Sequence, residues 1–383
     1  MRHASGMPRL LWIAVKLFDK SVDKATWLET MENLGKEFEV HFLTSWRDRP
    51  PAISVCGRPI GYFPQYGIGP VRKATRRLLM RREARRQIAK VSPDIVLLNC
   101  TSNRRMLHTV VNACRHEGAK VVLDVRTLPT TDQKDHAWTV FGKSLVFASR
   151  HFDGVTYITG EMRRYCIERH HLPGHPSAVW TSGVNPDLFQ SGNGCPNGGV
   201  FRLLYHGGCI SASRGLGCLI QALDRIRDLD VRLTLLSSLR ERAAVEWIDR
   251  LAIPDRVTLM DTIPYPQVPE EIHRCHAGIL PFPACDVWNT SSPIKLFEYA
   301  ACGKPVIVTD IPAHRNILKD QPFAFFASDA SPEALAVAIR KAHAVRDRFP
   351  ILGQAARQWV LAEHTWACQA RRLGTFLKQV LES

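Results

Sequence analysis

Short apolar runs alternate with longer amphipathic stretches along the first half of the chain. The runs are rich in aliphatic and β-branched residues and predict buried strands, and the stretches carry apolar positions at helical spacing. We expect strands at residues 9–15, 39–43, 94–99, 120–125, 154–159 and 178–180. We expect helices at residues 26–36, 71–90, 103–117, 136–150 and 161–169. Strands and helices that alternate in this way are typical of a doubly wound parallel sheet.

The same alternation begins again in the second half. Strands are expected at residues 201–205, 231–236, 256–260, 277–283, 306–308 and 323–326. A helix is expected at residues 293–301, and three final helices are expected to start at residues 332, 351 and 366. The Gly-, Asn- and Pro-rich segment 190–199 reads as a linker. The pattern predicts two Rossmann-like domains, residues 1–185 and 186–365, followed by a terminal helix at residues 366–383.

Size and composition agree with two ordinary globular domains. The chain has 383 residues, of which 45% are hydrophobic and 23% charged, which is enough for two domains with full cores. Its eleven cysteines form no CxxC pair and are expected to be reduced thiols. Cys166, His170 and His171 are expected to be surface residues rather than zinc ligands. No signal peptide and no apolar run of the ~20 residues needed to cross a bilayer is expected.

A net charge of +15 points to an anionic partner, and much of this charge lies in one helix. Residues 71–90 carry nine Lys or Arg and one acid, Glu83, beside a modest apolar stripe. Such a helix suits an anionic membrane surface, and a solvated surface helix is the alternative. Nucleic acid is not expected, because the basic residues are not interleaved with aromatic ones. The membrane-facing cations would be Arg76, Arg77, Arg81, Arg82, Arg85 and Arg86.

Residues 291–312, SSPIKLFEYAACGKPVIVTDIP, combine a capped helix with a buried strand. Ser292 is the expected N-cap, Pro293 suits the first helical position, and Gly303 suits a left-handed C-cap. Lys295 and Glu298 are three residues apart and therefore share a face. A helix N-terminus beside a lysine attracts phosphate, and a glutamate one turn on can accept bonds from two hydroxyls. The stretch predicts a nucleotide-sugar site. A plain capped helix is the alternative.

Residues 206–216, HGGCISASRGL, predict a phosphate-binding loop at the start of the second domain. Glycines free backbone N–H groups to face phosphate, and Arg214 before Gly215 can hold phosphate oxygens with two bonds. A simple strand–loop–helix turn is the alternative. In the first domain, Asp124 and Arg126 lie at the end of a predicted strand, where ligands of such sheets bind. A structural ion pair is the alternative for these two residues.

Taken together, these stretches resemble the donor site of retaining glycosyltransferases of family 4. The match rests on SPIKLFEY and RGL, on Asp124 and Arg126 within a D-x-R segment, and on SGVNPDLF at residues 182–189. Thr290 and Cys209 depart from the family pattern, and Arg126 replaces its histidine. The resemblance implies the α/β GT-B fold, two Rossmann-like doubly wound domains facing each other across a cleft, with the terminal helix crossing back to the first domain. It implies donor contacts from Gly208, Arg214, Gly215, Ile263, Ser292, Pro293, Ile294, Lys295, Leu296 and Glu298.

The implied activity is retaining transfer of a sugar from a nucleotide diphosphate-sugar co-substrate. The first domain would bind a glycan or polyprenyl-diphosphate-linked acceptor in cell-surface or exopolysaccharide biosynthesis. Asp124 and Arg126 are the candidate catalytic residues. No cofactor or metal is expected to be obligatory, because Arg214, Lys295 and the helix N-termini could stabilise the departing diphosphate. The expected location is cytoplasmic, peripheral on the inner face of the cell membrane. A nucleotide-sugar epimerase and a non-enzymatic binder of anionic lipid or nucleic acid are the alternatives.

Overall fold

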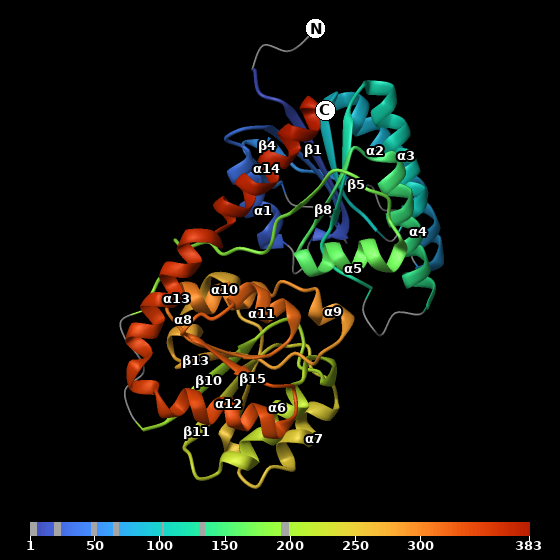
Figure 1. The fold of residues 1–383 in the computed structure, drawn as a ribbon. Helices are drawn as coiled ribbons and strands as arrows, with labels where there is room; N and C mark the ends of the chain where they lie inside the picture. The colour runs from blue at the N-terminus through green and yellow to red at the C-terminus, as the bar shows by residue number, and fades with distance from the viewer. Residues whose placement is uncertain are drawn as a thin grey trace. The chain divides into compact units, whose positions relative to one another are not determined.

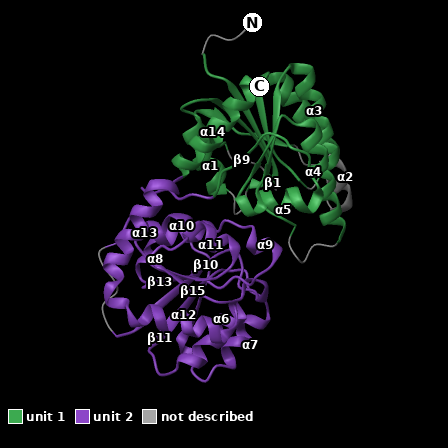
Figure 2. Ribbon diagram, in the orientation of Figure 1, with its two compact units in different colours: residues 1–181, 366–383 green, residues 182–365 purple. Residues whose placement is uncertain are grey.

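The computed structural model consists of two compact units (Figure 2). Unit 1 comprises Met1–Thr181 and Trp366–Ser383, and unit 2 comprises Ser182–Thr365. The structure describes residues 6–18, 24–46, 52–63, 69–101, 103–129, 135–192 and 199–383, with only the backbone at residues 69–77. The division after Thr181 falls earlier than the boundary expected after residue 185. The segment 190–199, expected as a linker, belongs to the sequence range of unit 2, and its residues 193–198 lie outside the described part.

Unit 1 is built on a seven-stranded sheet in which every neighbouring pair is parallel. Its order is β5 (Gly61–Phe63), β2 (Glu39–Ser45), β1 (Arg9–Leu17), β6 (Ile95–Asn99), β7 (Lys120–Val125), β8 (Gly154–Tyr157) and β9 (Ser177–Val179). The strands were predicted except β5 and the small antiparallel pair β3 (Ser54–Val55) and β4 (Arg58–Pro59). These three are too short to show a periodic pattern. Because the order grows outward from β1 in both directions, the sheet is doubly wound.

Helices cover both faces of this sheet (Figure 1). On one face, α1 (Lys24–Leu34) packs against α14 (Trp366–Glu382). On the other lie α2 (Gly69–Val91), α3 (Arg104–Glu117), α4 (Asp135–His151) and α5 (Gly160–His170), each in contact with the next. Leu10, Trp12 and Ala14 of β1 join the core beneath α1 and α14, while Leu11 and Ile13 between them are buried as well. Since successive side chains point to opposite faces, β1 is covered on both sides.

Unit 2 repeats this architecture with a six-stranded parallel sheet. Its order is β12 (Val257–Met260), β11 (Val231–Leu236), β10 (Phe201–His206), β13 (Ala277–Leu280), β14 (Val306–Thr309) and β15 (Ala324–Ala327). Its helices are α6 (Leu216–Ala222), α7 (Ala243–Asp249), α8 (Val268–His273), α9 (Asp286–Asn289), α10 (Ile294–Ala301), α11 (Pro312–Leu318), α12 (Pro332–Ala344) and α13 (Phe349–Glu363). The short helices α7, α8, α9 and α11 were not predicted. The fold class expected from the sequence, two doubly wound α/β domains, is confirmed.

Two further expectations concern particular side chains. Cys166 was expected at the surface, but it is fully buried beneath α5, and His170 is half-buried. The expectation of surface residues was therefore wrong for Cys166, which belongs to the core. No three His, Cys, Asp or Glu side chains of the described residues are grouped so that they could hold a metal ion. Within the same residues, no helix is both long and apolar enough to cross a bilayer.

The topology of unit 2 indicates where a ligand would bind. Strand order reverses between β10 and β13, because the chain builds β11 and β12 to one side and β14 and β15 to the other. In open α/β sheets, the crevice beyond the carboxyl ends of the strands at such a reversal is the usual ligand site. His206 ends β10, and α10 follows β13, so both approach this point.

Candidate functional site

Helix α10 carries the central residues of the site, and its first turn differs from the prediction. The helix begins at Ile294 with Pro293 as N-cap, and no side chain caps it. Ser292 was expected to cap the helix, but its hydroxyl accepts a hydrogen bond from Ser182 N (3.2 Å). Its carbonyl accepts a second bond from the Ser182 hydroxyl (2.7 Å). Ser292 therefore fixes the entry of the chain into unit 2. Gly303 adopts the predicted left-handed conformation (φ 70°) after the helix.

Tyr299 attaches α10 to the central strand of the sheet. Its hydroxyl donates to Leu204 O (2.9 Å) and accepts from His206 N (3.1 Å). The side chain is fully buried. Gly278 of β13 makes room for its ring, because a Cβ there would lie 2.1 Å from a ring carbon. These contacts hold the helix at one rotation, in which the residue before Tyr299 faces the carboxyl end of β10.

That residue, Glu298, has a nearly buried carboxylate, 3% exposed. The Tyr265 hydroxyl donates to its Oε1 (2.8 Å), and His206 Nε2 lies 3.3 Å from its Oε2. Burial raises the pKa of Glu298, although the Tyr265 hydrogen bond and the Lys295 charge act in the opposite direction. Burial, together with the Lys295 charge, lowers the pKa of His206 to about 3, so the imidazole is neutral near pH 7.

Lys295 lies one turn before Glu298 on the same helix. Its ammonium stands over the rings of Tyr205 (5.4 Å) and Phe282 (5.7 Å), measured to the ring centroids. Gly207 leaves space for it, because a Cβ at that position would lie 2.9 Å from Lys295 Nζ. Burial lowers the pKa of Lys295, and the nearby charge of Arg214 lowers it further. The ammonium therefore has a weakly solvated environment that favours an anionic ligand.

Arg214 reaches the same region from the loop after β10. It ends the short 3₁₀ turn Ala212–Arg214, and Gly215 follows with φ 74°. A Cβ at Gly215 would lie 1.9 Å from Pro281 O, so only glycine fits this approach to the chain after β13. The Arg214 guanidinium lies 4.9 Å from the ring centroid of Trp288, whose Nε1 donates to Ser213 O (2.7 Å). The loop is thus held by an aromatic platform from α9.

The predicted donor residues fall into two groups. Arg214, Lys295 and Glu298 converge. Lys295 stands over Phe282, which is stacked on the Trp288 ring that Arg214 covers (ring centroids 4.2 Å apart), and Glu298 lies one turn along the helix from Lys295. Gly208 lies in the bend directly after β10. Leu296 is buried in the core of unit 2, and Ile263 is half-buried against that core. Side-chain contact with a ligand is therefore expected from the charged residues, with backbone contacts from Gly208, Ile263, Pro293 and Ile294.

Sequence reasoning did not single out four side chains of this site, namely Tyr205, His206, Tyr265 and Trp288. The position of His206 at the end of a predicted central strand was a usable signal, because the ends of such strands face the ligand crevice. Tyr265 lies in a loop with no periodic pattern. Its contact with Glu298 depends on tertiary packing, so no local signal could have revealed it.

In unit 1, Asp124 is buried and fully engaged. Its carboxylate accepts hydrogen bonds from Thr156 Oγ1 (2.8 Å), Trp180 Nε1 (3.1 Å) and Asn99 Nδ2 (3.2 Å). Burial raises its pKa, and the Arg126 charge and these bonds act against that rise. The carboxylate thus joins β6, β7, β8 and the chain after β9 in one network.

Arg126 extends beyond the end of β7 and is half-buried. Its Nη1 donates to Trp180 O (2.7 Å), and its guanidinium carbon lies 3.8 Å from the centroid of the Trp180 ring. Asp124 therefore holds the indole nitrogen of Trp180, while Arg126 lies over its ring and bonds its backbone carbonyl. Arg126 is the member of this pair that lies at the ligand edge of the sheet.

Each half of the chain matches a family model of glycosyltransferases. Residues 25–188 match the family Glycosyltransferase Family 4, and residues 200–344 match Glycosyl transferases group 1. None of the curated protein sequences matches the chain. The two matched segments correspond to the two α/β domains. They favour a glycosyltransferase over the epimerase and non-enzymatic alternatives.

Solved structures of glycosyltransferases share the whole fold. Sucrose-phosphate synthase from Thermosynechococcus elongatus superposes with a TM-score of 0.77 at 14% identity, covering 98% of this chain and 99% of that one. HepE from Anabaena, in a complex with UDP and glucose, gives 0.73 at 13% identity, covering 97% and 99%. WaaG, a glycosyltransferase involved in lipopolysaccharide biosynthesis, gives 0.69 at 13% identity, covering 94% and 98%. At these identities the likeness establishes the fold.

The role of Tyr299 can be tested by removing one oxygen atom. We expect Tyr299→Phe to lower the free energy of unfolding by about 1–3 kcal/mol, because Leu204 O and His206 N would lose a buried partner. Urea unfolding followed by tryptophan fluorescence measures this change. Tyr157→Phe is the matched control, since the hydroxyl of this equally buried tyrosine makes a long contact with His175 Nε2 (3.4 Å) and none with a strand backbone group. Equal losses in the two variants would contradict the anchoring role.

Proposed function

Because this chain is a family 4-like glycosyltransferase, we propose that it transfers a sugar, with retention, from a nucleotide diphosphate-sugar bound by unit 2. The acceptor is a glycan or a polyprenyl-diphosphate-linked sugar in cell-surface or exopolysaccharide biosynthesis. The observation that carries this proposal is the convergence of Lys295, Glu298 and Arg214 at the point of unit 2 where the strand order reverses.

The diphosphate is assigned to Lys295 and Arg214. Negative charge builds on the departing diphosphate as the glycosidic bond breaks, and fixed positive groups in a weakly solvated site stabilise that charge. Burial and mutual repulsion lower the pKa of Lys295 in the free protein. A diphosphate between the two cations removes the repulsion and favours the charged lysine. No metal ion is required for this role.

The ribose is assigned to Glu298. A carboxylate has two acceptor oxygens, which match two neighbouring hydroxyls on a ribose ring. In the free protein, Tyr265 donates to one of these oxygens and His206 lies near the other. A ribose would take the place of the Tyr265 hydroxyl and release that residue toward the base. Uridine diphosphate is the first nucleotide to test, because HepE is described in complexes with UDP and with UDP-glucose.

Unit 1 is assigned to the acceptor, with Arg126 at its catalytic edge. Transfer with retention of configuration needs no enzyme nucleophile if the leaving diphosphate itself takes up the acceptor proton. Arg126, at the end of β7, is the residue of unit 1 assigned to this step. Asp124 acts as a positioning residue, because its carboxylate holds the Trp180 indole on which Arg126 is stacked.

A peripheral location on the inner face of the cell membrane, in the cytoplasm, completes the proposal. Of the six arginines assigned to the membrane, the side chains of Arg76 and Arg77 lie outside the described part of α2. Arg82, Arg85 and Arg86 are exposed, and Arg81 is half-buried. Arg86 is paired with Glu83 (2.6 Å), so it offers less net attraction to anionic lipid than the others.

Binding of nucleotide-sugars tests the donor site. We expect one of the UDP-, GDP-, ADP- or TDP-sugars to raise the melting temperature of the wild-type protein, since a ligand at a hundredfold excess over Kd stabilises by about 2.7 kcal/mol. Arg214→Gln and Glu298→Gln should each abolish the shift. Arg250→Gln, at an exposed position directly after α7, is the control for charge and should leave it intact. An equal shift in wild type and both site variants would refute the assignment, and an inverted anomeric product would refute retention.

Co-sedimentation with vesicles tests the membrane assignment. Each basic residue near an anionic surface contributes about 1 kcal/mol. Replacing Arg81, Arg82 and Arg85 by Gln should therefore release the protein from phosphatidylglycerol vesicles by a large factor. Wild-type protein should not bind phosphatidylcholine vesicles. Undiminished binding of the triple variant would show that α2 is a solvated helix.

A further inference from the structure

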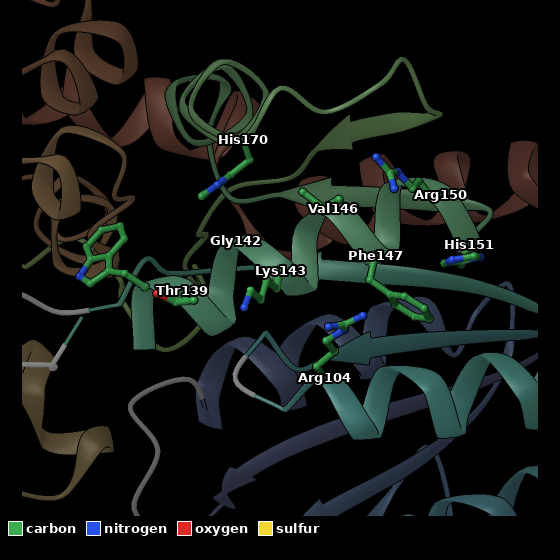
Figure 3. Close-up of a pocket in the computed structure, with 10 residues that line it drawn as sticks. Arg104, Thr139, Gly142, Lys143, Val146, Phe147, Arg150, His151 and His170 are labelled. Atoms are coloured by element: carbon green, nitrogen blue, oxygen red, sulfur yellow. The ribbon is translucent and has the colours of Figure 1, made fainter. Parts of the chain in front are cut away.

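A cavity on the outer helical layer of unit 1 lies outside the proposed donor site, which belongs to unit 2. It has a volume of about 490 Å³ and lies over α3, α4 and α5 (Figure 3). This size is within the range of small-molecule sites. Its lining includes Arg104, Trp138, Lys143, Phe147, Arg150 and His170.

The charged side chains of this cavity are all positive. Arg104 begins α3, while Lys143 and Arg150 lie on α4, and all three are exposed. Their side chains form no ion pair or hydrogen bond with any residue that the structure describes. No acidic residue lines the cavity, and one carboxylate, Asp135, lines the adjoining hollow. Burial and the charges of Arg104 and His151 lower the pKa of the neighbouring His108. The positive side chains of the cavity therefore repel one another, and a bound anion would reduce this repulsion.

The floor of the cavity is aromatic. The ring of Phe147 lies between two imidazoles, with ring centroids 3.9 Å from His108 and 4.4 Å from His151. Trp138, nine residues earlier on α4, is half-buried and also lines the cavity. A flat apolar group can pack on these rings while an attached anion contacts the cationic rim.

The backbone of α4 shapes one wall. Figure 3 shows His170 reaching from α5 toward Gly142. A Cβ at Gly142 would lie 2.6 Å from His170 Cε1, so glycine allows the imidazole to rest against the helix. His170 Nε2 is buried and has no hydrogen-bond partner among the described residues. A buried polar atom without a partner is costly, and a ligand oxygen would satisfy it.

We propose that this cavity binds a phosphate-bearing molecule with an apolar or aromatic portion. The phosphate contacts Arg104, Lys143 and Arg150. Each arginine guanidinium can hold two phosphate oxygens, and the lysine ammonium adds a single positive charge. The apolar portion packs on the ring of Phe147. The molecule is a soluble phosphate ester or the headgroup of a phospholipid, since both present this chemistry.

Calorimetric titration of the full chain with phenyl phosphate tests the site directly. We expect phenyl phosphate to bind more tightly than inorganic phosphate, because only the ester has a ring. The double variant Lys143→Gln/Arg150→Gln should weaken binding at least tenfold. The matched control Arg163→Gln/Arg164→Gln removes the same charge from exposed positions on α5 and should change binding less than twofold. Arg214→Gln should retain binding, which separates this site from the proposed donor site.

Vesicles identify the source of the phosphate. Binding to vesicles containing phosphatidic acid, lost in Lys143→Gln/Arg150→Gln with α2 intact, would support a lipid headgroup. Binding of phenyl phosphate without such vesicle binding would support a soluble ester. If neither probe binds, or if the α5 control weakens binding as much as the cavity variant, the proposal is overturned.

Discussion

The hydrogen bonds of one buried tyrosine set the geometry of unit 2. Tyr299 accepts from and donates to two backbone groups of β10, and its ring fills the space left by Gly278 in β13. Because α10 is held at this rotation, Glu298 is brought beside His206, and Lys295 one turn earlier comes to lie against Gly207. The positions of the charged residues in the candidate donor site therefore depend on Tyr299, an uncharged side chain in the core.

The sequence was informative wherever the determining interactions are local. The shared face of Lys295 and Glu298 follows from helical spacing, and the left-handed turn at Gly303 follows from the residue type. The predicted cap failed because Ser292 bonds to Ser182, a residue far away in the sequence. For Asp124, the sequence left an ion pair and a functional role equally open. Its hydrogen bonds to Asn99 and Trp180 arise from tertiary packing, so no local pattern could predict them. Sequence patterns predict elements and their faces, but not the partners that those faces meet.

The two units carry their charge in different ways. In unit 2, a lysine and a glutamate of one helix are withdrawn from water, and burial shifts their pKa values in opposite directions. In unit 1, cations gather on a layer of consecutive helices, from α2 to α4. Arg86 of α2 is paired with Glu83, but no acidic residue lines the cavity that holds Arg104, Lys143 and Arg150. The buried lysine and glutamate of unit 2 are stable only in a defined geometry. The surface cations of unit 1 repel one another, and solvent and salt screen this repulsion. The positive net charge of the chain therefore reflects a surface property of unit 1 as well as a binding property of unit 2.

The position of α14 has a consequence for how the protein is made. Leu373, Phe376 and Leu377 belong to the same core as Trp12 and Trp27, although they come from the last helix of the chain. Unit 2 is continuous in sequence and is synthesised completely before this helix appears. During translation, the face of the first sheet that carries α1 therefore stays uncovered by α14 until residues 366–382 have left the ribosome. Domains usually fold in the order of their synthesis, but in this chain the domain that begins first is completed last.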